Sequence, residues 1–172
     1  MIKICFFSGD ITRGGGTERV ATMIANELDK QEQYQVMFLS LVEAASELFY
    51  PLNDTIGHYA LAKRWIQPGP GYIPLIGKVR RFVQEQEIDV LIDIDIVLDI
   101  LSIPATRKLK TKVISWEHFN YQFESSVFYR KCILKYSVKH SDYVVTLTER
   151  DKESYAHYLG RQKEIEVIYN PM

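Results

Sequence analysis

Short apolar runs alternate with amphipathic helical segments along this chain, and the alternation limits the folds that it can adopt. The runs are continuous in Val, Ile, Leu and Phe, which is typical of strands buried on both faces of a parallel sheet. The predicted strands are Ile2–Ser8, Tyr34–Leu41, Ile56–Leu61, Asp89–Ile94, Lys112–Trp116, Asp142–Leu147 and Ile165–Tyr169. We therefore predict an α/β domain with a Rossmann-like parallel sheet and helices on both faces.

The segments between the strands have the period of a helix. In Thr17–Lys30, apolar side chains recur every four residues, which places them on one face. The other predicted helices are Ile73–Gln86, Val97–Leu109, Val127–Lys139 and one that begins after Thr148. We expect Pro104 to interrupt or cap the third of these five. We expect Thr148 to cap the last one together with Asp151 in a capping box.

A glycine triplet, Gly14, Gly15 and Gly16, lies between the first strand and the first helix. Without side chains there, an anionic group can approach the helix N–H groups and the positive end of the helix dipole. Alternatively, the glycines only form a tight strand-to-helix turn. The triplet does not match G-x-G-x-x-G, and Glu43 after the second strand is a weak ribose candidate, so a dinucleotide site is a remote alternative.

Parallel sheets of this kind bind ligands beyond the carboxyl ends of their strands. Glu117 and His118 follow the strand that ends at Trp116. An imidazole at this edge can act as an acid, a base or a hydrogen-bond donor near neutral pH. The neighbouring rings of Trp116, Phe119 and Tyr121 either stack on a sugar or pack in the core.

Two acidic residues, Asp93 and Asp95, leave the fourth strand at the same edge. Their carboxylates could accept hydrogen bonds from sugar hydroxyls, and Asp95 is the candidate for this contact. No second cluster of metal ligands accompanies them, so we expect no metal site. We expect Asp99 to lie on the following helix and to be solvated.

The net charge and the cysteine content restrict the possible binding partners and the cellular compartment of the protein. The formal net charge of −1 provides no global field that attracts nucleic acid. Two cysteines in apolar segments, with no signal peptide and no apolar run of about 20 residues, indicate a cytoplasmic protein. Between residues 107 and 139, eight basic residues accompany two acidic ones. This segment could contact an anionic membrane or a pyrophosphate-linked substrate, or it could be an ordinary solvated face.

Four segments together resemble the N-terminal half of a family-4 retaining glycosyltransferase with the GT-B fold, of the capsule or exopolysaccharide type. They are FFSGDITRGGGTERVATMIANEL, ISWEHFNY, SDYVVTLTERDKESY and VIYNP, in this order. The resemblance implies a chain that transfers a sugar from a nucleotide-sugar donor to a lipid-linked or polysaccharide acceptor, without a further cofactor. Residues 1–169 would form the acceptor-side domain, and residues 170–172 would begin the interdomain hinge.

The resemblance also implies roles for particular residues. His118 would contact the donor sugar and assist transfer, and Gly15 and Gly16 would lie against the donor diphosphate or the acceptor. Arg19 would anchor the first helix or approach the acceptor. The candidate substrate-binding residues are Gly14, Gly15, Gly16, Arg19, Asp95, Glu117, Thr148 and Glu149. Among them Glu117 has no defined role.

The family's second domain, which holds the nucleotide and neutralises the leaving diphosphate, has no counterpart in these residues. We therefore expect hexosyl transfer from the full-length enzyme and no activity from this part alone. The alternative is a stand-alone α/β module that binds a dinucleotide or a carbohydrate without catalysis.

Overall fold

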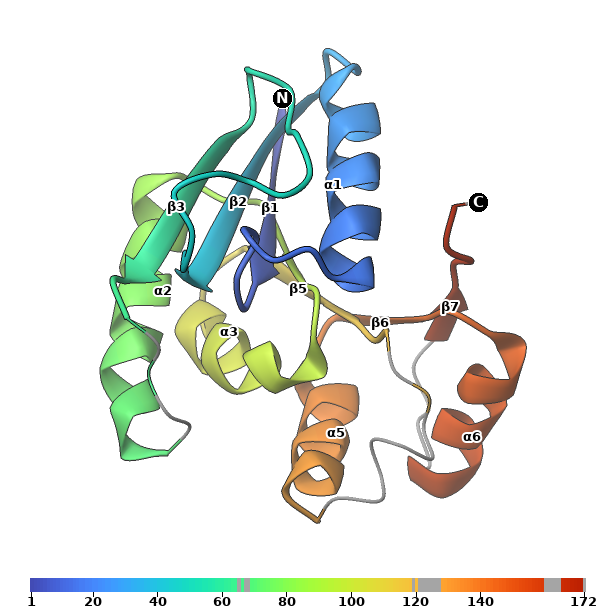
Figure 1. The fold of residues 1–172 in the computed structure, drawn as a ribbon. Coiled ribbons are helices and arrows are strands. Elements are labelled where there is room, and N and C mark those ends of the chain that lie inside the picture. Colours follow the sequence, from blue (N-terminus) through green and yellow to red (C-terminus); the bar gives the residue numbers. More distant parts are fainter. Residues whose placement is uncertain (65, 67–68, 119, 121–127, 160–164, 172) are drawn as a thin grey trace.

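One parallel sheet forms the centre of the molecule. A computed structural model describes residues 1–64, 66, 69–118, 120, 128–159 and 165–171 (Figure 1). The strands are β1 (Ile2–Ser8), β2 (Tyr34–Val42), β3 (Gly57–Ala62), β4 (Val90–Asp93), β5 (Lys112–Trp116), β6 (Tyr143–Thr146) and β7 (Ile165–Val167). All pair in parallel, in the order β3-β2-β1-β4-β5-β6-β7. The predicted Rossmann-like sheet is confirmed.

Helices cover both faces of this sheet. The helices are α1 (Gly16–Asp29), α2 (Ile73–Glu85), α3 (Asp99–Thr106), α5 (Phe128–His140) and α6 (Glu149–Leu159), with the 3-10 turns η1 (Pro70–Tyr72) and η2 (Ile96–Leu98). Helix α1 lies on one face, and α2 and α3 lie on the other (Figure 1). Several residues named in the sequence analysis or close to its elements lie outside the described residues. They are the rings Phe119 and Tyr121, the predicted helix start Val127, Gln67, Pro68 and the last hinge residue, Met172.

The alternation of side chains along the middle of β1 explains why residues 4–7 are all apolar. Ile4 and Phe6 pack in the core beneath α1, whereas Cys5 and Phe7 pack in the core beneath α2 and α3. Both faces of the strand are thus buried, so no position needs a polar residue. Phe6 lies opposite Phe38 of β2, and their rings stack with centroids 5.2 Å apart.

Pro104 does not interrupt its helix, but the helix ends two residues after it, so the expected interruption is wrong and the expected end near Pro104 is confirmed. Helix α3 continues to Thr106 with Pro104 inside it. A proline removes one backbone N–H donor, and the hydroxyl of Thr106 adds a bond in the same turn by donating to the Ser102 carbonyl at 2.9 Å. The segment begins earlier, in η2, where the Asp95 carboxylate accepts from the N–H of Val97 at 2.9 Å.

Candidate functional site

The carboxyl edge of the sheet carries a pocket that joins distant parts of the chain. We call it the His118 pocket, and its volume is ≈ 660 Å³. Its lining includes Gly15, Gly16, Arg19, His118, Asn170 and Pro171. The start of α1, the end of β5 and the segment after β7 therefore meet here. The predicted proximity of the glycine loop and His118 is confirmed.

His118 is a neutral hydrogen-bonding group in this pocket. Burial lowers its pKa from 6.5 to about 4, so the imidazole is uncharged at neutral pH. Its ring tilts against Trp116, with centroids 4.3 Å apart, and Trp116 itself is part of the core beneath α1. No described residue offers a hydrogen-bond partner to the buried Nε2 atom of His118. A neutral imidazole can exchange hydrogen bonds with a ligand hydroxyl.

Four predicted substrate-binding residues do not line this pocket or the smaller one beside it: Gly14, Glu117, Thr148 and Glu149. Glu117 is buried, with 1% of its surface exposed. Thr148 is exposed and caps α6, because the N–H of Asp151 donates to its Oγ1 at 3.1 Å and its hydroxyl donates back to the Asp151 carboxylate at 2.7 Å. The predicted cap by Thr148 is confirmed, and its hydroxyl pairs with the Asp151 carboxylate. Glu149 follows as the first residue of α6 and is exposed.

Close approach explains two glycines of the triplet better than turn geometry does. Among the described residues, only Gly69, Glu87 and Lys108 have a positive φ, so the triplet needs no left-handed backbone. A Cβ on Gly14 would lie 3.0 Å from the ring of Phe49. A Cβ on Gly15 would overlap the Glu18 carboxylate, whereas one on Gly16 would meet nothing within 4 Å.

Glu18 is a site residue that the sequence analysis missed. Its side chain is folded toward Gly15, accepts a hydrogen bond from the Thr17 hydroxyl at 2.8 Å, and is 6% exposed. The carboxylate thus lies near the start of α1, where the helix dipole favours negative charge. An anionic ligand at this helix start would therefore meet a carboxylate of the chain itself. The available signal was a glutamate three residues after the N-cap Gly15.

This geometry predicts different effects for two adjacent glycine substitutions. Gly15→Val should displace the Glu18 carboxylate and reduce the free energy of unfolding by about 0.5–2 kcal/mol, because valine is a much poorer N-cap residue than glycine. Gly16→Ala should be neutral or stabilising by about 0.5 kcal/mol, because its Cβ meets open space at a helical position. Urea denaturation of both variants measures the difference, and equal stabilities would contradict the packing described here.

A second pocket, the switch-point pocket, adjoins the first. It lies at the carboxyl ends of β1, β2 and β4, where the strand order reverses between β1 and β4, and its volume is ≈ 290 Å³. Arg13, Thr17 and Glu18 line both pockets. Asp95 lines only the switch-point pocket, so this predicted residue faces a different cavity from His118. Arg130 of α5 also lines the switch-point pocket. No local sequence signal predicted this position, because it results from the packing of α5 against the rest of the fold.

Asp93 and Asp99 form a buried acidic pair rather than ligands at the surface. Both are fully buried, so the expectation of a solvated Asp99 is wrong. Asp99 accepts from the Ser115 hydroxyl at 2.5 Å, and the Ser102 hydroxyl donates to Asp93. Burial, and then the neighbouring Asp99, hold the pKa of Asp93 well above its usual range. Burial also raises the pKa of Asp99, although its hydrogen bonds act in the opposite direction. We infer that Asp93 is the protonated partner.

The remaining sequence expectations concern metal binding, membrane spanning, the ribose candidate and the cysteines. In that part of the chain no group of three or more His, Cys, Asp or Glu residues could hold a metal ion. Nor does any helix there have the length and apolarity to cross a membrane. Glu43, the weak ribose candidate, binds Nδ1 of His58 at 2.9 Å. Cys5 is buried and Cys132 is exposed, and both are free thiols.

A parallel sheet with pockets at its carboxyl edge and at its switch point defines a Rossmann-like domain of the kind found in GT-B glycosyltransferases. The family model described as Glycosyltransferase Family 4 matches residues 14–172. The chain belongs to this family. A curated relative from Haemophilus influenzae, an uncharacterized glycosyltransferase, is 35% identical over 152 residues, which cover 88% of this chain and 42% of that protein.

Solved structures agree on the fold. The apo lipopolysaccharide outer core galactosyltransferase WaaB has a TM-score of 0.74 at 18% identity, covering 99% of this chain and 46% of that one. Sucrose-phosphate synthase from Thermosynechococcus elongatus has a TM-score of 0.79 at 10% identity, covering 98% and 48%. Anabaena HepE in complex with UDP-glucose has a TM-score of 0.72 at 15% identity, covering 100% and 44%. The chain spans less than half the length of each of these proteins.

Proposed function

We propose that residues 1–169 form the acceptor-side domain of a glycosyltransferase that moves a hexose from a nucleotide-sugar donor to a lipid-linked or polysaccharide acceptor. Residues 170–172 would begin the hinge to a nucleotide-binding domain outside this chain. The observation that carries the proposal is the His118 pocket, which collects Gly15, Gly16 and His118 beside Asn170 and Pro171. Membership of the glycosyltransferase family favours this function over a non-catalytic sensor.

The chemistry of the pocket suits sugar transfer. In such a transfer the sugar develops oxocarbenium character while a diphosphate departs, so groups that hold the sugar and offset the negative charge accelerate the step. The neutral His118 can exchange a hydrogen bond with a donor-sugar hydroxyl without adding positive charge to the developing cation. Arg19 lines the same pocket and supplies a cation near the start of α1. WaaB is a galactosyltransferase and HepE was solved with UDP-glucose, which supports a UDP-hexose donor.

The test is activity of the natural full-length gene product against a panel of UDP- and GDP-sugars with lipid-linked acceptors. We expect turnover with at least one donor and acceptor pair, in a cytoplasmic fraction or on the inner face of the membrane. A well-folded full-length protein that neither binds a nucleotide sugar in a thermal-shift assay nor transfers its sugar would overturn the proposal.

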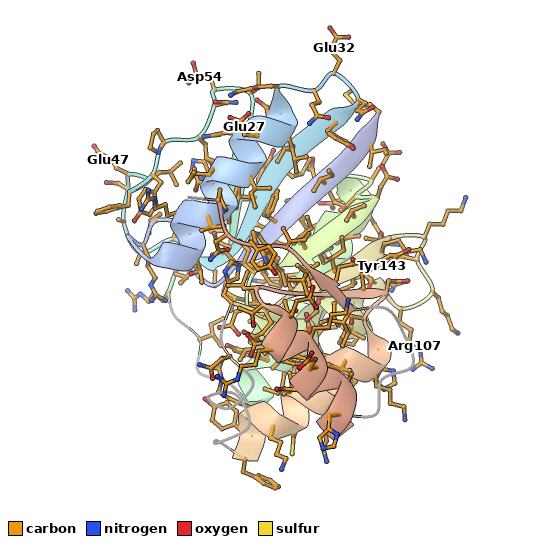
Figure 2. All side chains as sticks on the ribbon, turned by 90° about the vertical axis from the view of Figure 1, so that its right-hand side faces the viewer. Glu27, Glu32, Glu47, Asp54, Arg107 and Tyr143 are labelled. Carbon is orange, nitrogen blue, oxygen red and sulfur yellow. The ribbon has the colours of Figure 1, made fainter. Side chains whose placement is uncertain are left out.

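We also propose that α5 brings this domain to an anionic membrane. Two aromatic side chains at its start, Phe128 and Tyr129, are 83% and 56% exposed. Three lysines follow on the same helix: Lys131, Lys135 and Lys139. The acidic residues labelled in Figure 2, which are Glu27, Glu32, Glu47 and Asp54, lie around α1 and its neighbouring loop, at the end of the molecule away from α5. Helix α5 itself carries no acidic residue, which favours an approach to anionic lipid with α5 foremost.

Neutralising two of these lysines should therefore weaken membrane binding. Each Lys near an anionic surface contributes about 1 kcal/mol, so Lys131→Gln with Lys135→Gln should lower the affinity for phosphatidylglycerol vesicles about 30-fold. Vesicle co-sedimentation at low and high salt measures the effect. Lys30→Gln, at the distant end of α1, is the control and should bind like wild type. Unchanged binding of the double variant would exclude α5 as the contact.

A further inference from the structure

The charged side chains that line the switch-point pocket have equal numbers of positive and negative charges. Four charged side chains line it: Arg13, Glu18, Asp95 and Arg130. Two are basic and two are acidic, and Nη2 of Arg130 lies 3.4 Å from Oδ1 of Asp95. The described lining therefore offers no net attraction to a phosphate, a carboxylate or an ammonium group. It offers strong hydrogen-bond donors and acceptors side by side, which suit a neutral ligand that carries both.

The rest of the lining is aromatic and aliphatic. Tyr72 of η1 and Tyr129 of α5 contribute rings, and Ile100 and Ile133 contribute aliphatic surface. Burial, and then the charge of Asp95, raise the pKa of Tyr72, so its hydroxyl remains protonated and uncharged. Aromatic rings match the C–H faces of a pyranose, whereas its rim of hydroxyls needs charged or polar partners. The volume of ≈ 290 Å³ is at the lower end of the range for small-molecule sites.

The switch-point pocket is also placed to serve the reaction. Arg13, Thr17 and Glu18 form the wall that it shares with the His118 pocket. A ring held in the switch-point pocket would therefore be separated from the donor-sugar position by the Glu18 carboxylate and its neighbours. Asp95 is held in place, because its carboxylate also accepts the N–H of Val97 at 2.9 Å as the N-cap of η2.

We propose that the switch-point pocket binds one neutral pyranose ring of the acceptor, with Asp95 accepting from and Arg130 donating to ring hydroxyls. The inference rests on the proposed transferase function and adds the class of acceptor. A neutral hexose is favoured over a uronic acid or a sugar phosphate, because an added negative charge would meet Glu18 and Asp95 without a surplus of cations.

The test is ligand-observed NMR binding to the natural full-length protein. The probes are the methyl α-pyranosides of glucose, galactose and mannose, compared with glucuronate and glucose 1-phosphate. We expect millimolar binding of at least one neutral pyranoside and at least tenfold weaker binding of both anions. Asp95→Asn and Arg130→Gln should each weaken that binding about tenfold, the loss of one hydrogen bond to a charged group. The controls Asp54→Asn and Arg81→Gln change residues that line neither pocket and should bind like wild type.

Further outcomes separate this inference from the proposed function. Release of nucleotide from the sugar donor without acceptor is measured on the same preparations, and thermal unfolding verifies that each variant is folded. If donor cleavage persists while no neutral pyranoside binds, or while an anion binds equally well, the acceptor assignment is wrong and the transferase function stands. Binding that is insensitive to both substitutions would place the pyranose elsewhere. Absence of both donor binding and cleavage would count against the function itself.

Discussion

Replacing His118 with alanine in the full-length protein should reduce sugar transfer about 10²- to 10³-fold while the fold remains intact. This range is the usual effect of removing one preorganised hydrogen-bonding group that acts on the transition state. The side chain lines the pocket that also contains Gly15 and Gly16, and its buried Nε2 has no partner among the described residues. The measurement is kcat with saturating donor and acceptor, accompanied by circular dichroism and thermal unfolding.

A matched substitution and the pH profile make this prediction specific. His140→Ala removes an imidazole from the far end of α5, where it stacks on Tyr136, and should leave transfer unchanged. Because the pKa of His118 is about 4, protonation of this residue should not limit the rate between pH 6 and 8. Transfer by His118→Ala at a rate near that of wild type would remove the histidine from the mechanism.

The second large effect concerns stability and comes from the buried acidic pair. Asp93→Ala should lower the free energy of unfolding by about 2–4 kcal/mol, because it leaves a cavity, removes the acceptor of the buried Ser102 hydroxyl and takes one hydrogen-bond partner from the Asp99 carboxylate. Asp93→Asn has the shape of the protonated acid and should cost far less. Urea denaturation at pH 7 distinguishes the two variants, and equal losses would mean that the proton and the hydrogen bonds of Asp93 contribute little.

The same pair predicts a pH dependence with a defined sign. The pKa of Asp93 is raised in the folded chain, so between the ordinary pKa of 3.8 and the raised value the folded state holds a proton that the unfolded state has released. The contribution of Asp93 to stability therefore falls as pH rises through this window. Asparagine does not titrate, so Asp93→Asn should gain stability relative to wild type as the pH rises from 3.8 through the raised pKa of Asp93. A difference that is constant over this range would contradict a protonated Asp93.

The first strand and helix illustrate what sequence patterns can predict. Continuous apolar runs indicate burial on both faces, and β1 indeed packs Phe6 against one helical layer and Phe7 against the other. The edge of the sheet that binds ligands follows from the same prediction, because all parallel strands end there. This rule was sufficient to predict that Gly15, Gly16 and His118 lie together.

Side-chain environments were harder to predict. Asp99 lies in a predicted helix, where a charged side chain usually faces solvent, yet it is fully buried and accepts a hydrogen bond from Ser115 of β5. Asp95 and His118 both follow strands at the same edge, but they face adjacent pockets. Arg130 reaches the switch-point pocket from α5, 35 residues beyond Asp95 in the chain. None of these relations is local in sequence, so hydrophobic periodicity carries no information about them.

The amino-acid sequence by itself determined the parallel α/β sheet, the edge at which its strands end and the loops that meet there, because periodicity and strand burial are local properties. Only the tertiary structure decided which of those loop residues share a pocket, that the Glu18 side chain is buried in the wall between the two pockets, and that Asp93 and Asp99 are enclosed together. These features depend on contacts between segments far apart in the chain, and their electrostatics follow from burial, which only the packed molecule defines.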